Sequence, residues 1–248
     1  MKNTEIVFNP FRLISPKLDA EASRLAQLFQ VPPKEVTCLE EGLLMMTGDL
    51  LKLTALIRKV LIIPDQEKLK ECDRLAKEIH DEEKGLTGAL VCNPRETTAE
   101  LLKIVVLFPG HLERVGDFLE SILNVVRIKA RQGVPFSDKA MAEIGELFDL
   151  LTEMLGNFQD VLLTRNRALL ERIREQADRV GELAIEFLVS HEDRLLEGLC
   201  SPFASSLFLD ILDSLKHAAF HLREMSEALL KITAMTDPLL DRSRGSVA

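Results

Sequence analysis

Apolar residues recur every three or four positions along most of the chain between residues 40 and 235. This spacing puts apolar side chains on one face of an α-helix, whereas a half-buried strand alternates apolar and polar residues. Breaks that contain proline divide the pattern, and Pro109-Gly110 predicts a kink or short break inside one stretch. We therefore predict a short helix at 18–28 and long helices at 43–61, 66–91, 98–131, 137–163, 166–198 and 202–234.

The clearest boundary is Gln-Gly-Val-Pro at 132–135, after which Ser137 is a candidate N-cap and a second set of three long helices begins. Short links between long helices make neighbouring helices antiparallel. The predicted fold is all-α, with two tandem antiparallel three-helix bundles and an extra N-terminal helical segment. The predicted divisions are an N-terminal extension with a short helix at 1–39, bundles at 40–132 and 136–236, and a disordered tail at 237–248.

Charge and composition narrow the classes of function. The net charge of −9 argues against a nucleic-acid partner, because phosphate backbones attract basic surfaces, and the chain has no Trp or Tyr on which bases could stack. None of the four cysteines forms a CxxC pair, so we interpret them as reduced, mostly buried thiols of a cytoplasmic protein. No window approaches 18 uninterrupted apolar residues, and the N-terminus lacks the pattern of a signal peptide. Membrane association is therefore expected only through a protein partner.

The segment His-Leu-Glu-Arg-Val-Gly-Asp at 111–117 carries the most specific chemistry in the chain. Glu113 and Asp117 are i, i+4 neighbours on one helix face, where two carboxylates repel unless a metal ion, a Lys or Arg, or water lies between them. A related segment, His-Leu-Arg-Glu-Met-Ser-Glu, follows at 221–227, with Arg223 in place of the first acid. One intact and one altered copy indicate a duplicated helical unit.

This segment, on the third helix of the first of two helical units, resembles the PhoU family. Members of that family carry Leu-Glu-Arg-Ile-Gly-Asp or close variants in each half, and residues 112–117 differ only at Val115. The resemblance extends over about 40–235. It implies a cytoplasmic regulator that restrains phosphate-responsive gene expression and acts with a phosphate transporter component, a sensor histidine kinase, or both. Similar domains also form cytosolic tails of sodium/phosphate cotransporters.

The resemblance also implies a metal site. PhoU proteins often carry Asp/Glu-x-x-x-Asp motifs on the second and third helices of each unit, which can hold iron, zinc or similar ions. Glu113 and Asp117 match the third-helix motif of the first unit, whereas Ala76 and His80 stand where the second helix usually has acids. A set of carboxylates and histidines suits iron, zinc or manganese. The predicted ligands are Glu113, Asp117, His80 and His111, and Glu83 is a further candidate; a solvated face or an internal salt bridge is the alternative.

The second unit is predicted to hold no metal. Arg223 places a cation at a former ligand position, where it can supply the charge that a metal would bring, and Ala177 and Gly181 replace the usual acids of the second helix. The candidate partners of Arg223 are Glu182, Glu186 and Glu227. His217 and His221 have the i, i+4 spacing of some zinc ligands, but without an HExxH context we interpret them as ordinary surface or interface histidines.

We predict a non-enzymatic regulator that acts by protein–protein contact, with a bound metal as a candidate modulator and a homo-oligomer as a candidate state. The sequence contains no GxxxxGK[ST], GxGxxG, GxSxG or HExxH motif. One alternative is a carboxylate-bridged metalloenzyme of helical-bundle type, which would need paired Glu-x-x-His motifs. His80 and His111 are instead preceded at i−3 by Lys77 and Phe108. The other alternative is a structural oligomerisation module.

Overall fold

The computed structural model describes residues 33–92 and 107–236, which form long helices joined by short links and contain no strand. The prediction of an all-α fold is confirmed. The predicted helix at 18–28 and the predicted tail at 237–248 lie outside the described residues. The helices are α2 (Pro33–Ile62), α3 (Gln66–Cys92), α5 (Phe108–Gln132), α6 (Asp138–Thr164), α7 (Arg167–Leu196) and α8 (Pro202–Thr236).

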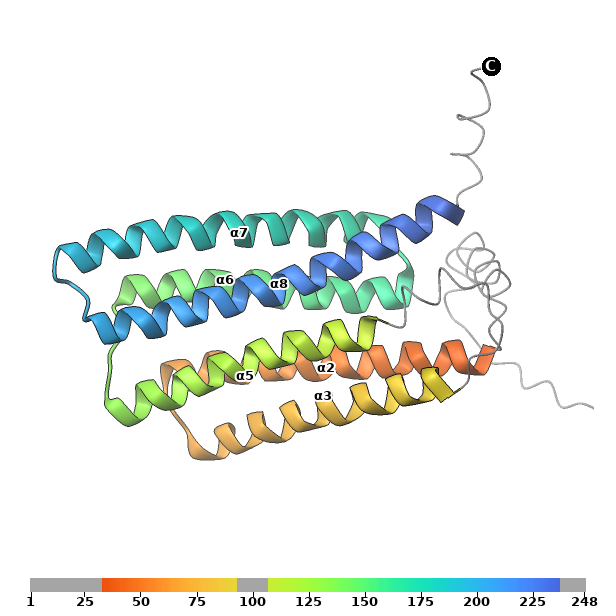
Figure 1. Ribbon diagram of the computed structural model, residues 1–248, viewed down its shortest axis with the longest axis horizontal. Helices are drawn as coiled ribbons and strands as arrows, with labels where there is room; N and C mark the ends of the chain where they lie inside the picture. The colour runs from red at the N-terminus through yellow and green to blue at the C-terminus, as the bar shows by residue number, and fades with distance from the viewer. Residues whose placement is uncertain (1–32, 93–106, 237–248) are drawn as a thin grey trace, which may run out of the picture.

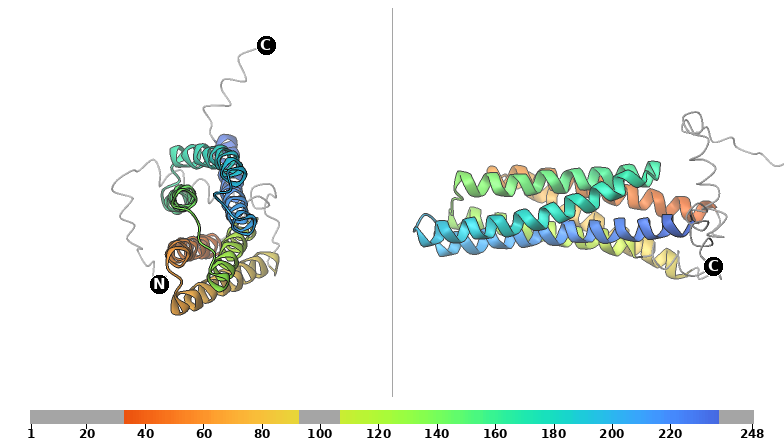
Figure 2. Two further views of the ribbon diagram at one scale, coloured as in Figure 1. Left: turned by 90° about the vertical axis from the view of Figure 1, so that its left-hand side faces the viewer. Right: turned by 90° about the horizontal axis from the view of Figure 1, so that it is seen from above.

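The described helices form two antiparallel three-helix bundles that lie side by side (Figure 1). Helices α2, α3 and α5 pack together as unit one, and α6, α7 and α8 pack together as unit two. Helix α5 lies along α8 and α2 lies along α6, so the units share a long interface (Figure 2). The buried apolar side chains of both units form one continuous core. None of the described helices combines the length and the apolar composition needed to cross a membrane.

Helices α2 and α5 each begin at or beside a proline. Helix α2 begins at Pro33, well before the predicted start at residue 43, and α5 begins at Phe108 with Pro109 in its first turn. The missing amide hydrogen of proline is harmless in a first turn, since that group would have no intrahelical acceptor there. The start of α5 therefore lies next to the predicted break at Pro109-Gly110. The predicted start near residue 98 lies outside the described residues.

Local capping ends α5 and begins α6 at the link between the two units. Gly133 adopts a left-handed conformation with φ 62°, and its amide donates to the carbonyl oxygen of Lys129. Glycine suits this position because it has no Cβ to clash. The Ser137 side chain then accepts a hydrogen bond from the Ala140 amide, which confirms Ser137 as the N-cap of α6.

Helix α5 occupies the position that brings the candidate residues together, since it contacts α3 on one side and α8 on the other. A Cβ at Gly116 would lie 3.4 Å from Cγ2 of Ile79 on α3, so glycine allows the two helices to approach closely. Glu113 and Asp117 flank this close approach.

Of the cysteines, Cys72 and Cys200 are free thiols, and burial raises the pKa of Cys72 to about 11.

Candidate functional site

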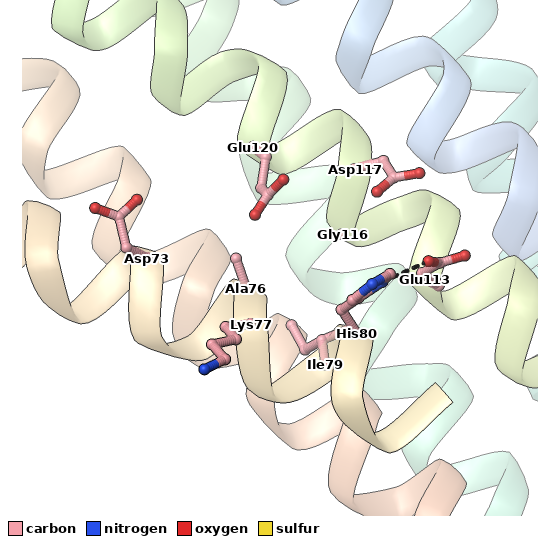
Figure 3. A pocket seen from close by; sticks show the side chains of 9 residues that line it. All are labelled: Asp73, Ala76, Lys77, Ile79, His80, Glu113, Gly116, Asp117 and Glu120. Atoms are coloured by element: carbon pink, nitrogen blue, oxygen red, sulfur yellow. Dashed lines mark hydrogen bonds and ion pairs between the residues drawn. The ribbon is translucent and has the colours of Figure 1, made fainter. Parts of the chain in front are cut away.

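A pocket of about 320 Å³ opens between α3 and α5 of unit one. Figure 3 shows side chains from both helices converging on it, with carboxylates on three sides. We call it the acidic pocket. It is lined by Asp73, Ala76, Lys77, Ile79, His80, Glu113, Gly116, Asp117 and Glu120.

The central contact of the acidic pocket joins the two helices. His80 Nδ1 lies 2.8 Å from Glu113 Oε1, and the two side chains are 47% and 22% exposed. Asp117 lies beside them and has only a long contact of 3.4 Å to Nη1 of Arg114. Partial desolvation, and then the charges of Asp117 and Asp73, raise the pKa of Glu120 above its ordinary value. The pocket therefore retains carboxylate charge that its own cations only partly balance.

The structure brings together three of the four predicted metal ligands, His80, Glu113 and Asp117, and separates the fourth. His111 does not line the pocket, and its Nδ1 lies 3.0 Å from Nδ1 of His221 on α8. Residues two positions apart on a helix are separated by about 200° around its axis, so His111 and Glu113 point to nearly opposite sides of α5. The further candidate, Glu83, accepts a hydrogen bond from Thr87 on its own helix.

The donor set of the acidic pocket does not form a ready metal site. Within residues 33–92 and 107–236, no group of three or more His, Cys, Asp or Glu side chains is arranged to hold a metal ion. One imidazole and one carboxylate in mutual contact provide fewer ligands than iron, zinc or manganese usually takes. Binding of a transition metal at Glu113 and Asp117 therefore stays a prediction.

The corresponding position of unit two is neutralised by an arginine. Arg223 Nη1 lies 2.7 Å from Oδ1 of Asp178 on α7, and its Nε lies 2.8 Å from Oε1 of Glu227. Glu227 is thus confirmed as a partner, and Asp178 is a second one. Glu182 pairs with Arg179 instead, and no ion pair joins Arg223 to Glu186 in the described ranges. A guanidinium therefore links α7 to α8 where unit one has carboxylates.

A buried polar cluster at the end of unit two was not predicted from the sequence. Glu143 on α6 and Arg194 on α7 form a bidentate ion pair, with side chains only 3% and 12% exposed. His191 is also buried, and its Nε2 lies 2.6 Å from Oγ of Ser205. A signal was present, because Glu143 stands at i+3 from buried Ala140 and so falls on the core-facing stripe of α6.

Comparison of the sequence with models of protein families and with curated proteins finds no match. Comparison with solved structures does find similar folds. The crystal structure of PhoU from Pseudomonas aeruginosa aligns with a TM-score of 0.70 and 16% identity, covering 82% of this chain and 99% of that one. The phosphate transport system regulatory protein PhoU from Streptococcus pneumoniae aligns with a TM-score of 0.69 and 13% identity, covering 81% of this chain and 96% of that one. The chain therefore has a PhoU-like fold.

Proposed function

We propose that this protein is a PhoU-like regulator of phosphate uptake and of phosphate-responsive signalling, and that it acts by protein–protein contact rather than by catalysis. The observation that carries the proposal is the fold. It matches the PhoU of P. aeruginosa over 82% of this chain, and the similar protein of S. pneumoniae is described as a regulatory protein of a phosphate transport system. The Leu-Glu-Arg-Val-Gly-Asp segment at 112–117 supports the same conclusion from the sequence.

The partners in this proposal are a component of a phosphate transporter, a sensor histidine kinase, or both. The protein would then be cytoplasmic and would reach the membrane through its partner. Contact through the acidic pocket suits a basic partner surface, because Asp117 and Glu120 present carboxylates there, whereas Asp73 is already paired with Arg127. Complementary charge of this kind mainly speeds encounter and sets specificity. A metal ion in the acidic pocket and a homo-oligomer belong to the same proposal as modulators of that contact.

The proposal is tested in a deletion strain that carries a phosphate-starvation reporter. Loss of the protein should change phosphate uptake or raise reporter activity in phosphate-rich medium, and the wild-type gene should restore both. Unchanged uptake and unchanged reporter activity in the deletion strain would contradict the proposed function.

The role of the acidic pocket is tested separately by complementation with Asp117→Lys. This change puts an ammonium beside Glu113 and reverses one charge of the pocket. The matched control is Asp160→Lys, an equal charge reversal at an exposed position of α6 in unit two. We expect Asp117→Lys to fail in regulation while helix content by circular dichroism stays normal, and Asp160→Lys to complement fully. Equal complementation by both variants would place the contact surface elsewhere on the protein.

A further inference from the structure

Two histidines meet across the interface between the units, and neither of them lines the acidic pocket. His111 on α5 and His221 on α8 are separated by 110 residues in the sequence, and their Nδ1 atoms lie 3.0 Å apart. Their ring centroids are 5.3 Å apart with an interplanar angle of 59°. Both side chains are partly buried, so solvent can still reach the pair.

The spacing of the two nitrogens matches that of neighbouring ligands on one metal ion. Zinc binds imidazole nitrogen at about 2.0–2.1 Å, so two nitrogens on a tetrahedral ion are about 3.3 Å apart, and two at a right angle are about 2.9 Å apart. The observed 3.0 Å lies between these values. Without a metal, the same distance suits an N–H···N hydrogen bond, in which one ring carries its proton on Nδ1. Metal binding would replace that hydrogen bond, and the ring proton would move to Nε2.

The surroundings of the two rings also favour neutral imidazoles. Burial lowers the pKa of His111, and burial, followed by the neighbouring His111 and Arg114, lowers the pKa of His221 to about 4. The neutral imidazole is the form that binds metals. The Phe118 ring stacks on His221 with centroids 5.8 Å apart and on His217 at 5.2 Å, which restricts how these rings can turn.

We propose that His111 and His221 form a two-histidine site for a borderline divalent metal ion, Zn²⁺ or Cu²⁺, that clamps unit one to unit two. Water would fill the remaining coordination positions, and the negative charge of Glu224 acts on His111. Imidazole ligands favour these ions, and Cu²⁺ should bind more tightly than Zn²⁺ by the general order of divalent metals. The site goes beyond the proposed function and does not depend on it.

Calorimetric titration of the metal-free, full-length protein with ZnCl₂ and with CuCl₂ tests the site. We expect one bound ion per chain at this site, and a loss of affinity of at least about tenfold when His111→Gln or His221→Gln removes one of its two protein ligands. One variant is a matched control that should keep the affinity. His217→Gln removes the neighbouring histidine on α8, which stacks on the same Phe118 ring.

A second measurement uses the unaltered protein and so does not depend on how well a variant folds. Addition of Zn²⁺ should shift the ring signals of both His111 and His221 in NMR spectra. Zn²⁺ should also raise the thermal midpoint of the wild type more than that of the His221→Gln variant, because binding to the native state alone stabilises it. Binding that is unaffected by either substitution, shifts confined to His80, or no binding of either ion would each overturn the proposal.

Discussion

The buried ion pair of Glu143 and Arg194 makes the sharpest prediction about stability. Oε1 and Oε2 of Glu143 accept hydrogen bonds of 2.9 and 2.7 Å from Nη1 and Nη2 of Arg194, which fastens α6 to α7. The guanidinium carbon also lies 5.8 Å from the ring centroid of Phe208 on α8. The hydrogen bond to Glu143 is the main reason why the pKa of Arg194 lies above its ordinary value. The pair thus holds a charge inside unit two at the point where its three helices meet.

Replacing Glu143 with Ala should reduce the free energy of unfolding by about 3–5 kcal/mol, because a buried guanidinium would lose its counter-charge. The remaining neighbours of the guanidinium are Ser190, whose Oγ lies 3.0 Å from Nη1, and Cys200, and Nε of Arg194 has no hydrogen-bond partner among the described residues. The double variant Glu143→Leu with Arg194→Met should recover most of the loss, because it removes both charges and keeps apolar volume in their place.

Urea denaturation followed by circular dichroism measures these differences. With a slope of about 2–3 kcal/mol per molar urea, the Ala variant should unfold at a midpoint lower by roughly 1–2 M. The matched control is Asp149→Ala, which breaks the exposed pair of Arg58 and Asp149, with side chains 43% and 62% exposed. That change should cost no more than about 1 kcal/mol. If Glu143→Ala costs as little as Asp149→Ala, the pair is not buried as described and the reasoning fails.

Three further predictions concern the metal, the pH dependence and Arg223. The metal prediction is tested in the His221→Ala variant, which lacks one ligand of the two-histidine site. Elemental analysis of this variant should find a transition metal, and adding Glu113→Ala and Asp117→Ala should remove it. An unchanged metal content would exclude both residues as ligands. Burial lowers the pKa of His191 in the folded state, so below about pH 6.5 the unfolded chain binds more protons than the folded one. The free energy of unfolding should therefore decrease as the pH is lowered through this range. Urea midpoints should show a shallower fall for His191→Gln, and parallel curves would refute this. Arg223→Ala removes a 39% exposed bridge, so the urea midpoint should reveal a loss of only about 1 kcal/mol; a loss several times larger would contradict that.

The sequence predicts the helices well because their signals are local. Apolar spacing and the cap at Ser137 each involve residues within one or two turns of each other. The role of Arg223 could also be predicted, because its place in the repeated segment at 221–227 indicated that a cation stands where a metal ligand would be. Its partner Glu227 is on the same helix and was anticipated. Asp178 was not anticipated, because it lies on another helix and its approach depends on how α7 packs against α8.

Contacts between the units could not be predicted in the same way. The pair of His111 and His221 joins residues from two bundles, and apolar spacing says nothing about which polar residues will meet across an interface. Part of the error was avoidable. The angle of about 200° between positions two apart on a helix already separates His111 from Glu113, so both could not have pointed at one ion between α3 and α5. Helix geometry can thus reject a ligand set before any tertiary contact is known.

The two units differ in the charge at one corresponding position, which is Glu113 in unit one and Arg223 in unit two. This difference affects which unit would attract a basic partner. In unit two, Arg223 lies between Asp178 and Glu227, so the carboxylates are already paired within the fold. In unit one, the corresponding Glu113 is contacted by the imidazole of His80 rather than by a guanidinium, which is always charged. The raised pKa of Glu120 reflects in part the nearby charge of other carboxylates. A cation from outside, whether a metal ion or a basic side chain of a partner, therefore has more to gain in unit one. The duplicated fold would thus present one self-neutralised face and one face that depends on a ligand or a partner for its missing positive charge.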